Sequence, residues 1–234
     1  RTLSLSHSSP TFDPMHRSTI IVAGGSGKRM GSAIPKQFML VKGKPLLCWT
    51  IEAFHAFDPA MPIIVVLPEA QITIWKALCI GCGFLIEHQV VAGGEERFHS
   101  TRNGLAALTG DGVVAVHDGV RPLVSKELIA RCFATAEAHG TAIPVVPVTS
   151  SIRQVQGDGS KAMDRSALRA VQTPQCFRIG LLRQAFEAPY DAAFTDEATL
   201  VERAGTMIHL VPGEENNVKV TTPLDLRIVS ALLS

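Results

Sequence analysis

The sequence predicts an α/β fold in which a doubly wound, mostly parallel sheet carries helices on both faces. Short runs of aliphatic and β-branched residues alternate with stretches of helical periodicity along most of the 234 residues. The first run, TIIVA at 19–23, ends in a glycine loop, as buried parallel strands commonly do. Such alternation favours helical crossovers between parallel strands, and a hydrophobic content of 46% supplies a sizeable core.

The first half of the chain keeps this rhythm. Apolar side chains recur at helical spacing within 44–57, and Ser125 is placed to cap the helix that follows it. We expect strands at 19–23, 62–67, 84–91 and 112–117, and helices at 44–57, 69–80, 100–108 and 125–139.

The second half contains one break in the rhythm. Residues 149–171 hold two short β-like pieces, SIRQV and LRAVQ, around the turn signal Gly157-Asp158-Gly159. Because such a segment does not tuck easily under the sheet, we expect it to project as an arm. The other elements expected are strands at 141–148 and 207–211, helices at 179–186 and 196–204, and a final helix from Thr222 with Pro223 at its first position.

The composition excludes several classes of protein. With 22 Lys and Arg against 21 Asp and Glu, the net charge of +1 argues against a nucleic-acid surface built on bulk charge. No apolar run approaches the ~18–20 residues that span a bilayer. Five cysteines, mostly in apolar segments, do not suit a secreted disulfide framework and favour a reducing cytoplasm. Cys79 and Cys82 lack the companions of a metal site and are expected to be partly buried thiols.

Residues 1–14 differ from the rest of the chain. They are rich in Ser, contain two prolines, show no hydrophobic periodicity and precede Met15. They also lack the apolar core of a secretory signal. We expect them to be an added leader or a flexible tail, followed by a single domain over 15–234.

The most informative loop follows the first expected strand, the place where open α/β sheets bind ligands. It has the sequence AGGSGKRMG at 23–31, and Lys36 follows within PKQ. Glycines let backbone N–H groups approach a phosphate or a base, and Arg29 and Lys36 add fixed positive charge. The spacing fits neither a Walker A loop nor the GxGxxG fingerprint. A simple glycine turn explains the four glycines and two basic side chains less well than a ligand-binding loop does.

Two more strand ends carry polar groups. Gly94 could line a base pocket with Ser100 one helical turn further on, although a loop and a helix cap explain them equally well. Asp118 follows the run GVVAV and could hold a metal or a substrate hydroxyl, while Arg121 could face a phosphate. We interpret His117 as a satisfied, partly buried residue rather than as a base.

Further hydroxyls, cations and acids are scattered along the second half. Each has a helix-cap or turn explanation, but together they suit a phosphorylated polyol. They are Ser151, Arg165, the QTPQ segment at 172–175, Thr195-Asp196-Glu197 and Asn217-Val218-Lys219.

Taken in order, these segments resemble the 2-C-methyl-D-erythritol 4-phosphate cytidylyltransferases of the non-mevalonate isoprenoid pathway. The resemblance runs from about Ser18 to the C-terminus. It rests on the motifs AGGSGKRMG, PKQF, GGEERFHS, HDGVRP, DRSAL, QTPQCF, TDEA and NVKVTTPLDL. It implies a Rossmann-like three-layer nucleotidyltransferase fold with a projecting β-arm at 149–171. In this family the arm clasps a second copy, so a homodimer is implied.

The resemblance also implies a reaction and a set of roles. CTP and methylerythritol 4-phosphate would give 4-diphosphocytidyl-2-C-methyl-D-erythritol and pyrophosphate, with Mg²⁺ held mainly by the CTP phosphates. Arg29 and Lys36 would stabilise the transition state. The residues implied to bind CTP are Ala23, Gly24, Gly25, Gly27, Gly94, Ser100 and Gly119. Those implied to bind the phosphosugar are Asp118, Arg121, Ser151, Thr173, Thr195 and Lys219, with Arg165 reaching across from the arm of the partner subunit.

Three positions depart from the family pattern. Val22 stands where proline is frequent, HDGVR replaces HDAAR, and Ser150-Ser151 replaces Asp-Thr. Ser151 keeps a hydroxyl, and a backbone contact at Val22 does not depend on the side chain.

Other functions share parts of this pattern. A ribitol 5-phosphate cytidylyltransferase has the same fold, CTP loop and QTPQ segment, and only TDEA favours the methylerythritol enzyme. A non-catalytic nucleotide-binding module would not need both Arg29 and Lys36. A glycosyltransferase commonly holds its metal with a DxD motif, whereas the strand before Asp118 ends in HDG.

Overall fold

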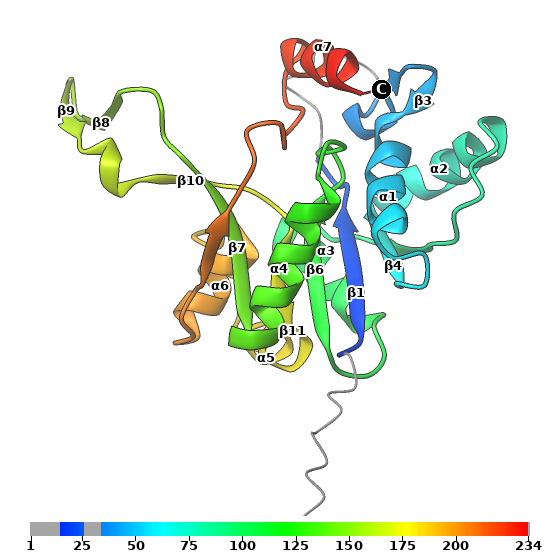
Figure 1. Ribbon diagram of the computed structural model, residues 1–234, viewed down its shortest axis with the longest axis horizontal. Helices are drawn as coiled ribbons and strands as arrows, with labels where there is room; N and C mark the ends of the chain where they lie inside the picture. Colours follow the sequence, from blue (N-terminus) through cyan, green and yellow to red (C-terminus); the bar gives the residue numbers. More distant parts are fainter. Residues whose placement is uncertain (1–14, 26–33, 234) are drawn as a thin grey trace, which may run out of the picture.

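The computed structural model describes residues 15–25 and 34–233, in which helices cover both faces of a central sheet (Figure 1). The eight strands run in the order β10-β7-β11-β6-β1-β4-β5, with β12 paired to β7. The predicted α/β fold with a mostly parallel sheet is confirmed. The expected tail at 1–14 lies outside the described residues.

Four parallel strands form the half of the sheet that positions the site. β1 (Arg17–Val22) lies between β4 (Ile63–Leu67) and β6 (Val113–Asp118), and β5 (Gln89–Ala92) pairs with β4. In register, Val22 lies opposite both Val66 and Asp118. The carboxyl ends of β1, β4 and β6 therefore meet at one edge, and the loops that leave them are neighbours.

The other half of the sheet is mixed. β11 (Gln175–Arg178) is antiparallel to β6 and to β7 (Thr141–Pro147), and β10 (Arg169–Val171) is antiparallel to β7. β12 (Leu210–Pro212) is parallel to β7. Antiparallel pairing of β11 lets the chain enter the sheet directly from the arm, without a helical crossover.

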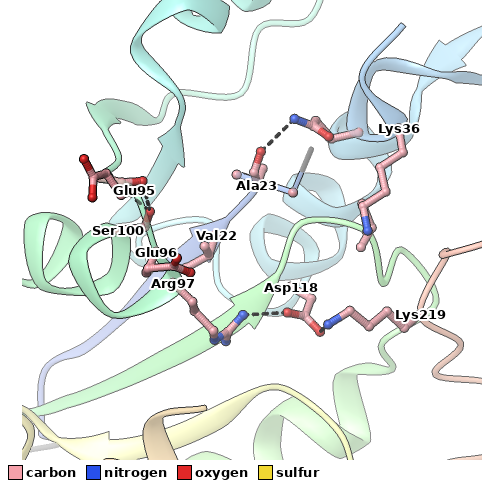
Figure 2. A pocket seen from close by; sticks show the side chains of 14 residues that line it. Val22, Ala23, Lys36, Glu95, Glu96, Arg97, Ser100, Asp118 and Lys219 are labelled. Atoms are coloured by element: carbon pink, nitrogen blue, oxygen red, sulfur yellow. Dashed lines mark hydrogen bonds and ion pairs between the residues drawn. The ribbon is translucent and has the colours of Figure 1, made fainter. Parts of the chain in front are cut away.

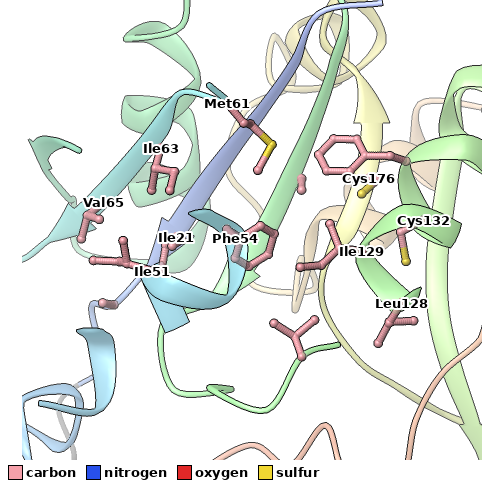
Figure 3. Close-up of a cluster of buried hydrophobic side chains, with 14 of the residues drawn as sticks. Ile21, Ile51, Phe54, Met61, Ile63, Val65, Leu128, Ile129, Cys132 and Cys176 are labelled. Carbon is pink, nitrogen blue, oxygen red and sulfur yellow. The ribbon is translucent and has the colours of Figure 1, made fainter. Parts of the chain in front are cut away.

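A separate hydrophobic cluster packs on each face of the sheet. β1 alternates between them, because Ile21 points into one and Ile20 into the other. The first cluster, part of which Figure 3 shows, is closed by α1 (Leu46–Phe57), α2 (Glu69–Gly81) and α4 (Lys126–His139). The second is closed by α3 (Arg97–Ala106), α5 (Ile179–Ala185) and α6 (Glu197–Arg203).

Helix starts follow the expected signals in two cases. The Ser125 hydroxyl accepts a hydrogen bond from the Leu128 amide at the start of α4. α7 (Pro223–Leu232) begins at Pro223, with Thr222 and Asp225 forming a capping box. Both expected helix starts are confirmed.

Several boundaries differ from those predicted. α3 begins at Arg97 rather than at residue 100, so Ser100 lies inside its first turn. Residues 84–88 are not paired in the sheet, since the Phe84 ring packs 6.2 Å from that of Trp75. β12 begins at Leu210, three residues later than expected. Lys44–Pro45 is the short strand β3, so α1 is two residues shorter than predicted.

Most of the segment at 149–171 leaves the body of the molecule, and β10 at its end returns to the central sheet. β8 (Ile152–Gln156) and β9 (Gly159–Met163) pair with each other, and a 3₁₀ turn (Arg165–Ala167) leads back to β10. Figure 1 shows this hairpin standing clear of the sheet and its helices. We call residues 149–171 the arm, and from Arg153 to Ala167 every residue of it is exposed.

Candidate functional site

A cavity of about 360 Å³ lies at the edge where the parallel strands end. Figure 2 shows side chains from β1, β6, the 3₁₀ turn of Lys36 and the start of α3 gathered around it. Its lining residues are Val22, Ala23, Gly24, Gly25, Lys36, Gln37, Gly94, Glu95, Glu96, Arg97, Ser100, Asp118, Val120 and Lys219. We call it the nucleotide cavity, because it holds most of the described residues predicted to bind CTP.

Gln37 fixes the glycine loop beside Lys36. It lies in the 3₁₀ turn Lys36–Phe38, and its buried Nε2 donates hydrogen bonds of 2.7 Å to the Ala23 carbonyl and to Oε1 of Gln71. A Cβ on Gly25 would come within 3.1 Å of Lys36 Cε, so glycine leaves room for the lysine side chain. One turn thus positions both the loop backbone and a cation at the cavity.

Gly94 and Ser100 form the opposite wall of this cavity. The Gly94 amide donates a 3.2 Å hydrogen bond to the buried Ser100 hydroxyl. A Cβ at Gly94 would clash with His99 at 2.4 Å, and the Ser100 Oγ lies 3.9 Å from the position of a Cβ on Gly24. The structure therefore brings together the two glycine segments that the sequence placed 70 residues apart.

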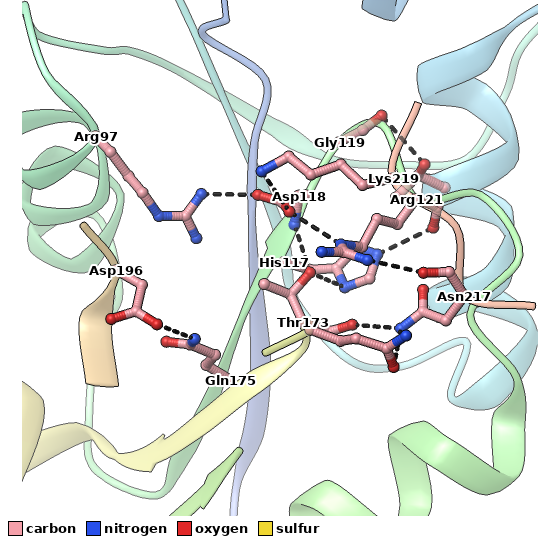
Figure 4. Close-up of polar contacts among 12 residues, drawn as sticks. Arg97, His117, Asp118, Gly119, Arg121, Thr173, Gln175, Asp196, Asn217 and Lys219 are labelled. Atoms are coloured by element: carbon pink, nitrogen blue, oxygen red, sulfur yellow. Dashed lines mark hydrogen bonds and ion pairs between the residues drawn. The ribbon is translucent and has the colours of Figure 1, made fainter. Parts of the chain in front are cut away.

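Asp118 lies at the centre of an ionic cluster on the floor of the cavity (Figure 4). Its Oδ1 accepts a 2.8 Å hydrogen bond from Arg97 Nη1, and its Oδ2 accepts one of 3.0 Å from Arg121 Nε. The Lys219 Nζ lies 3.0 Å from the same Oδ2. Burial alone would raise the pKa of Asp118, but the charges of Arg97, Lys219 and Arg121 outweigh it and hold the pKa well below its usual range.

Arg97 connects Asp118 to a second buried carboxylate. Its Nε and Nη2 donate to the two oxygens of Glu197 at 3.0 and 2.8 Å, and Thr101 donates to Glu197 Oε1 at 2.7 Å. Burial would lower the pKa of Arg97, but Glu197 and Asp118 raise it further, so the guanidinium stays charged. The cluster, counted as Arg97, Arg121, Lys219, Asp118 and Glu197, carries one positive charge in excess. Such a floor suits an anionic ligand.

His117 is held neutral beneath this cluster. Its Nε2 lies 3.1 Å from the Arg121 carbonyl, which can only accept, so Nε2 carries the proton. Its Nδ1 then accepts from the Thr173 hydroxyl at 3.1 Å, and that hydroxyl accepts from the Asp118 amide at 3.0 Å. Complete burial lowers the pKa of His117 to about 3. The prediction that His117 is a satisfied residue is confirmed, although its burial is complete rather than partial.

A second cavity of about 160 Å³ adjoins the first. Arg97, Asp118 and Lys219 line both cavities. The remaining lining residues are Arg121, Val171, Gln172, Thr173, Gln175, Thr195 and Asp196. We call it the acceptor cavity, since all but Ser151 and Arg165 of the residues predicted to bind the phosphosugar line it.

Of the other five predicted site residues, three lie elsewhere and two are outside the described residues. Ser151 and Arg165 are exposed on the arm, where Arg165 donates to the Thr149 carbonyl, and neither lines a cavity of the described chain. Gly119 is buried behind the glycine loop, where a Cβ would come within 2.8 Å of the Cβ of Ala23. Gly27 and Arg29 lie outside the described residues.

The sequence analysis gave no role to three residues that the structure places at the site, namely Arg97, Glu197 and Gln37. Arg97 stood in a motif quoted for its glycines, and its partner Glu197 lies 100 residues away. Gln37 stood beside the lysine of PKQF. For Arg97 and Gln37 a signal existed, namely a charged or amide side chain close to a strand-end glycine loop, whereas Glu197 follows no such loop. No spacing rule identifies the partner of any of the three residues.

The structure also tests the predictions that Cys79 and Cys82 are partly buried thiols and that no segment spans a membrane. All five cysteines are free; Cys79 is half-buried as expected, whereas Cys82 is exposed and that prediction was wrong. Of the helices in the described ranges, none is long and apolar enough to cross a membrane.

Comparisons with known proteins identify the family of the chain. The family model described as IspD, 2-C-methyl-D-erythritol 4-phosphate cytidylyltransferase, matches residues 18–234. The 2-C-methyl-D-erythritol 4-phosphate cytidylyltransferase of Bacteroides fragilis is 50% identical over 219 residues, covering 94% of this chain and 100% of the relative. The crystal structure of the Thermus thermophilus enzyme of that name has a TM-score of 0.77 and 34% identity, covering 93% of this chain and 98% of that one. The Francisella tularensis enzyme has a TM-score of 0.77 and 29% identity, covering 93% and 100%.

The family match covers almost the whole described chain, and the relatives are matched over nearly their full lengths. The same stretch contains both cavities and the ionic cluster between them. This chain therefore belongs to the 2-C-methyl-D-erythritol 4-phosphate cytidylyltransferase family.

Proposed function

We propose that this chain transfers a cytidylyl group from CTP to 2-C-methyl-D-erythritol 4-phosphate and releases pyrophosphate. The observation that carries the proposal is the pair of adjoining cavities that share Arg97, Asp118 and Lys219. One cavity has the glycine-rich backbone walls that suit a nucleotide, and the other has the hydroxyls and cations that suit a phosphorylated polyol. A shared cationic floor would bring two anionic substrates together.

The reaction asks for positioning and charge stabilisation rather than a protein nucleophile. An oxygen of the acceptor phosphate attacks the α-phosphorus of CTP, a new P–O bond forms, and the bond to the pyrophosphate leaving group breaks. Lys36 borders the nucleotide cavity beside Gly25 and would stabilise the charge that develops on the non-bridging oxygens. Arg29 is proposed to share this role.

Asp118 and its neighbours would orient the acceptor. Because its pKa is held low, Asp118 offers only acceptor oxygens and would receive hydrogen bonds from a polyol hydroxyl. Arg121 and Lys219 would hold negative charge on the ligand, and the exposed Thr195 would close the wall of the acceptor cavity. Thr173 is already committed to His117 and the Asp118 amide, so it would offer only its remaining lone pair.

We also propose that Mg²⁺ enters with the triphosphate. Both oxygens of Asp118 accept from cations, and Glu95 and Glu96 are the other carboxylates that line the nucleotide cavity. Within the described ranges no three His, Cys, Asp or Glu side chains are grouped to hold a metal. These residues fit an ion held by the nucleotide, where Mg²⁺ would neutralise phosphate charge.

A homodimer is part of the proposal. Ser151 and Arg165 lie on the arm and away from both cavities of their own chain. The arm also exposes apolar side chains, among them Val155 and Met163. A second copy would bury this surface and could receive the partner's Arg165 at its acceptor cavity. We place the dimer in a reducing cytoplasm, which the five free cysteines suit.

Pyrophosphate release with CTP and Mg²⁺ tests the proposed activity. We expect strong release with methylerythritol 4-phosphate and little with ribitol 5-phosphate. Strong release with ribitol 5-phosphate alone would keep the fold and the CTP site but replace the proposed acceptor. Absence of release with either, while CTP still binds, would favour a non-catalytic nucleotide-binding module.

A further inference from the structure

Two helices start on either side of the acceptor cavity, and a buried ion pair joins their first residues. Arg97 is the first residue of α3, and Glu197 is the first residue of α6. The Glu197 side chain is only 2% exposed, and both of its oxygens accept from Arg97. Thr101, one turn along α3, supplies a further hydrogen bond to Glu197 Oε1.

The same pair connects two walls of the acceptor cavity. On one side Arg97 Nη1 holds Oδ1 of Asp118. On the other side Glu197 directly follows Thr195-Asp196, which line the cavity. Asp196 is itself fixed, because it caps α6 and accepts a 2.8 Å hydrogen bond from Gln175. Movement of Glu197 would therefore disturb both the Asp118 carboxylate and the Thr195 loop.

Glu197 is separated from both substrates. It lines neither the nucleotide cavity nor the acceptor cavity, and its side chain is linked to their lining through Arg97. The groups expected to hold the nucleotide, such as Ala23, Gly94 and Ser100, are held by Gln37 and by each other. A change at Glu197 should therefore reach the acceptor site more strongly than the nucleotide site.

We infer that Glu197 is a positioning residue for the phosphosugar: through Arg97 it sets the orientation of Asp118 and holds the Thr195 loop over the acceptor cavity. This inference rests on the proposed function. It explains why a charged residue at the start of α6 is buried against Arg97 at the start of α3, away from solvent. It assigns a role to the glutamate of TDEA that is distinct from the direct contacts of Thr195.

The test is steady-state kinetics of Glu197→Gln with both substrates varied. The substitution keeps the shape of the side chain but removes the charge that holds Arg97. Loss of a charge-assisted buried hydrogen bond should raise KM for methylerythritol 4-phosphate about tenfold or more, while KM for CTP stays close to that of the unmodified chain. Thermal unfolding followed by circular dichroism checks that the variant is folded.

Four further variants keep the test decisive. Thr101→Val removes one hydrogen bond to Glu197 without stranding a charge, so it should shift the same KM by a smaller factor even if Glu197→Gln folds poorly. The double variant Arg97→Met with Glu197→Gln should have the same phosphosugar KM as Arg97→Met alone. Both substitutions break the same Arg97–Glu197 contact, so their effects on this KM should not add. Glu137→Gln is the matched control, because it breaks the Arg17–Glu137 ion pair elsewhere on the molecule and should change neither KM.

The outcomes separate this inference from the proposed function. Equal rises in both KM values, or a loss of stability with unchanged kinetics in Glu197→Gln and Thr101→Val, would show a purely structural ion pair and overturn the inference. Lack of turnover by the unmodified chain with methylerythritol 4-phosphate would instead contradict the proposed function.

Discussion

The floor of the site and the arm both carry many charged side chains, but they hold them in opposite ways. On the floor, Arg97 and Arg121 are paired with the buried carboxylate of Asp118. On the arm, Arg165 and Arg153 are exposed and bond to backbone or hydroxyl groups of the arm itself. The floor is thus complete within one chain, whereas the arm presents cations that its own chain does not use at either cavity.

This difference separates the residues that are expected to act within one chain from those that are expected to act on a second copy. The Asp118 cluster is oriented before any ligand binds, because ion pairs hold its groups and Asp118, Arg121 and Glu197 are also buried. The arm has no such packing within the described chain, since its hairpin strands pair only with each other. We therefore expect variants of the floor to act within their own chain and variants of the arm to act on the second copy.

The largest effect is expected at the cations of the nucleotide cavity. Lys36→Ala should lower kcat by about 10²–10³, because transition-state charge loses one stabilising group, and Arg29→Ala should act similarly. Lys126→Ala, at the exposed start of α4, serves as the control. Turnover that is unchanged in Lys36→Ala or in Arg29→Ala would remove that residue from the mechanism.

A smaller and more selective effect is expected on the arm. Arg165→Ala should raise KM for the phosphosugar about tenfold, as loss of one charge-assisted hydrogen bond does, with little change in CTP binding. Arg153→Ala, also on the arm but bonded to Ser160, should leave both values near those of the unmodified chain. Similar kinetic changes in the two variants would mean that the arm acts through its general charge and not through Arg165.

The smallest effect concerns the pH dependence of the free energy of unfolding, which should be changed by a substitution of His117 beneath the floor and not by one on the arm. The unfolded chain protonates His117 below about 6.5, whereas the folded chain keeps it neutral down to about 3, so acidification favours unfolding over this window. His117 should contribute ~1.4 kcal/mol per pH unit there. Urea unfolding of His117→Gln between pH 4 and 7 should show a flatter dependence.

Asp164→Asn on the arm provides the comparison for this measurement. Its carboxylate is fully exposed and caps only the 3₁₀ turn of the arm through the Ser166 amide. The pH dependence of unfolding should therefore match that of the unmodified chain. An equal flattening in His117→Gln and Asp164→Asn would contradict the assignment of this window to the floor.

The sequence predicted much of the sheet and the helices because the strands of the parallel half are mostly short aliphatic runs between glycine or proline signals. It did not predict β11, whose sequence QCFR is not such a run. It missed boundaries where tertiary packing decides: Phe84 lies in an apolar run, yet its ring packs against Trp75 instead of extending a strand. In the site, strand-end position was enough to identify Asp118 and Lys36. It was not enough for Arg97, because its partner Glu197 lies on another helix and only the folded chain brings the two together.

Mixing two impaired variants tests most directly the claim that the acceptor site is shared between copies. In a mixed dimer of Lys36→Ala and Arg165→Ala chains, the Arg165→Ala subunit keeps its own Lys36 and receives the partner's Arg165. At a phosphosugar concentration well below the raised KM of Arg165→Ala, pyrophosphate release should therefore recover after subunit exchange and exceed the mean of the two separate variants. Absence of recovery, with mixed dimers demonstrated by native mass spectrometry, would contradict the sharing of the site and confine the chemistry to one chain.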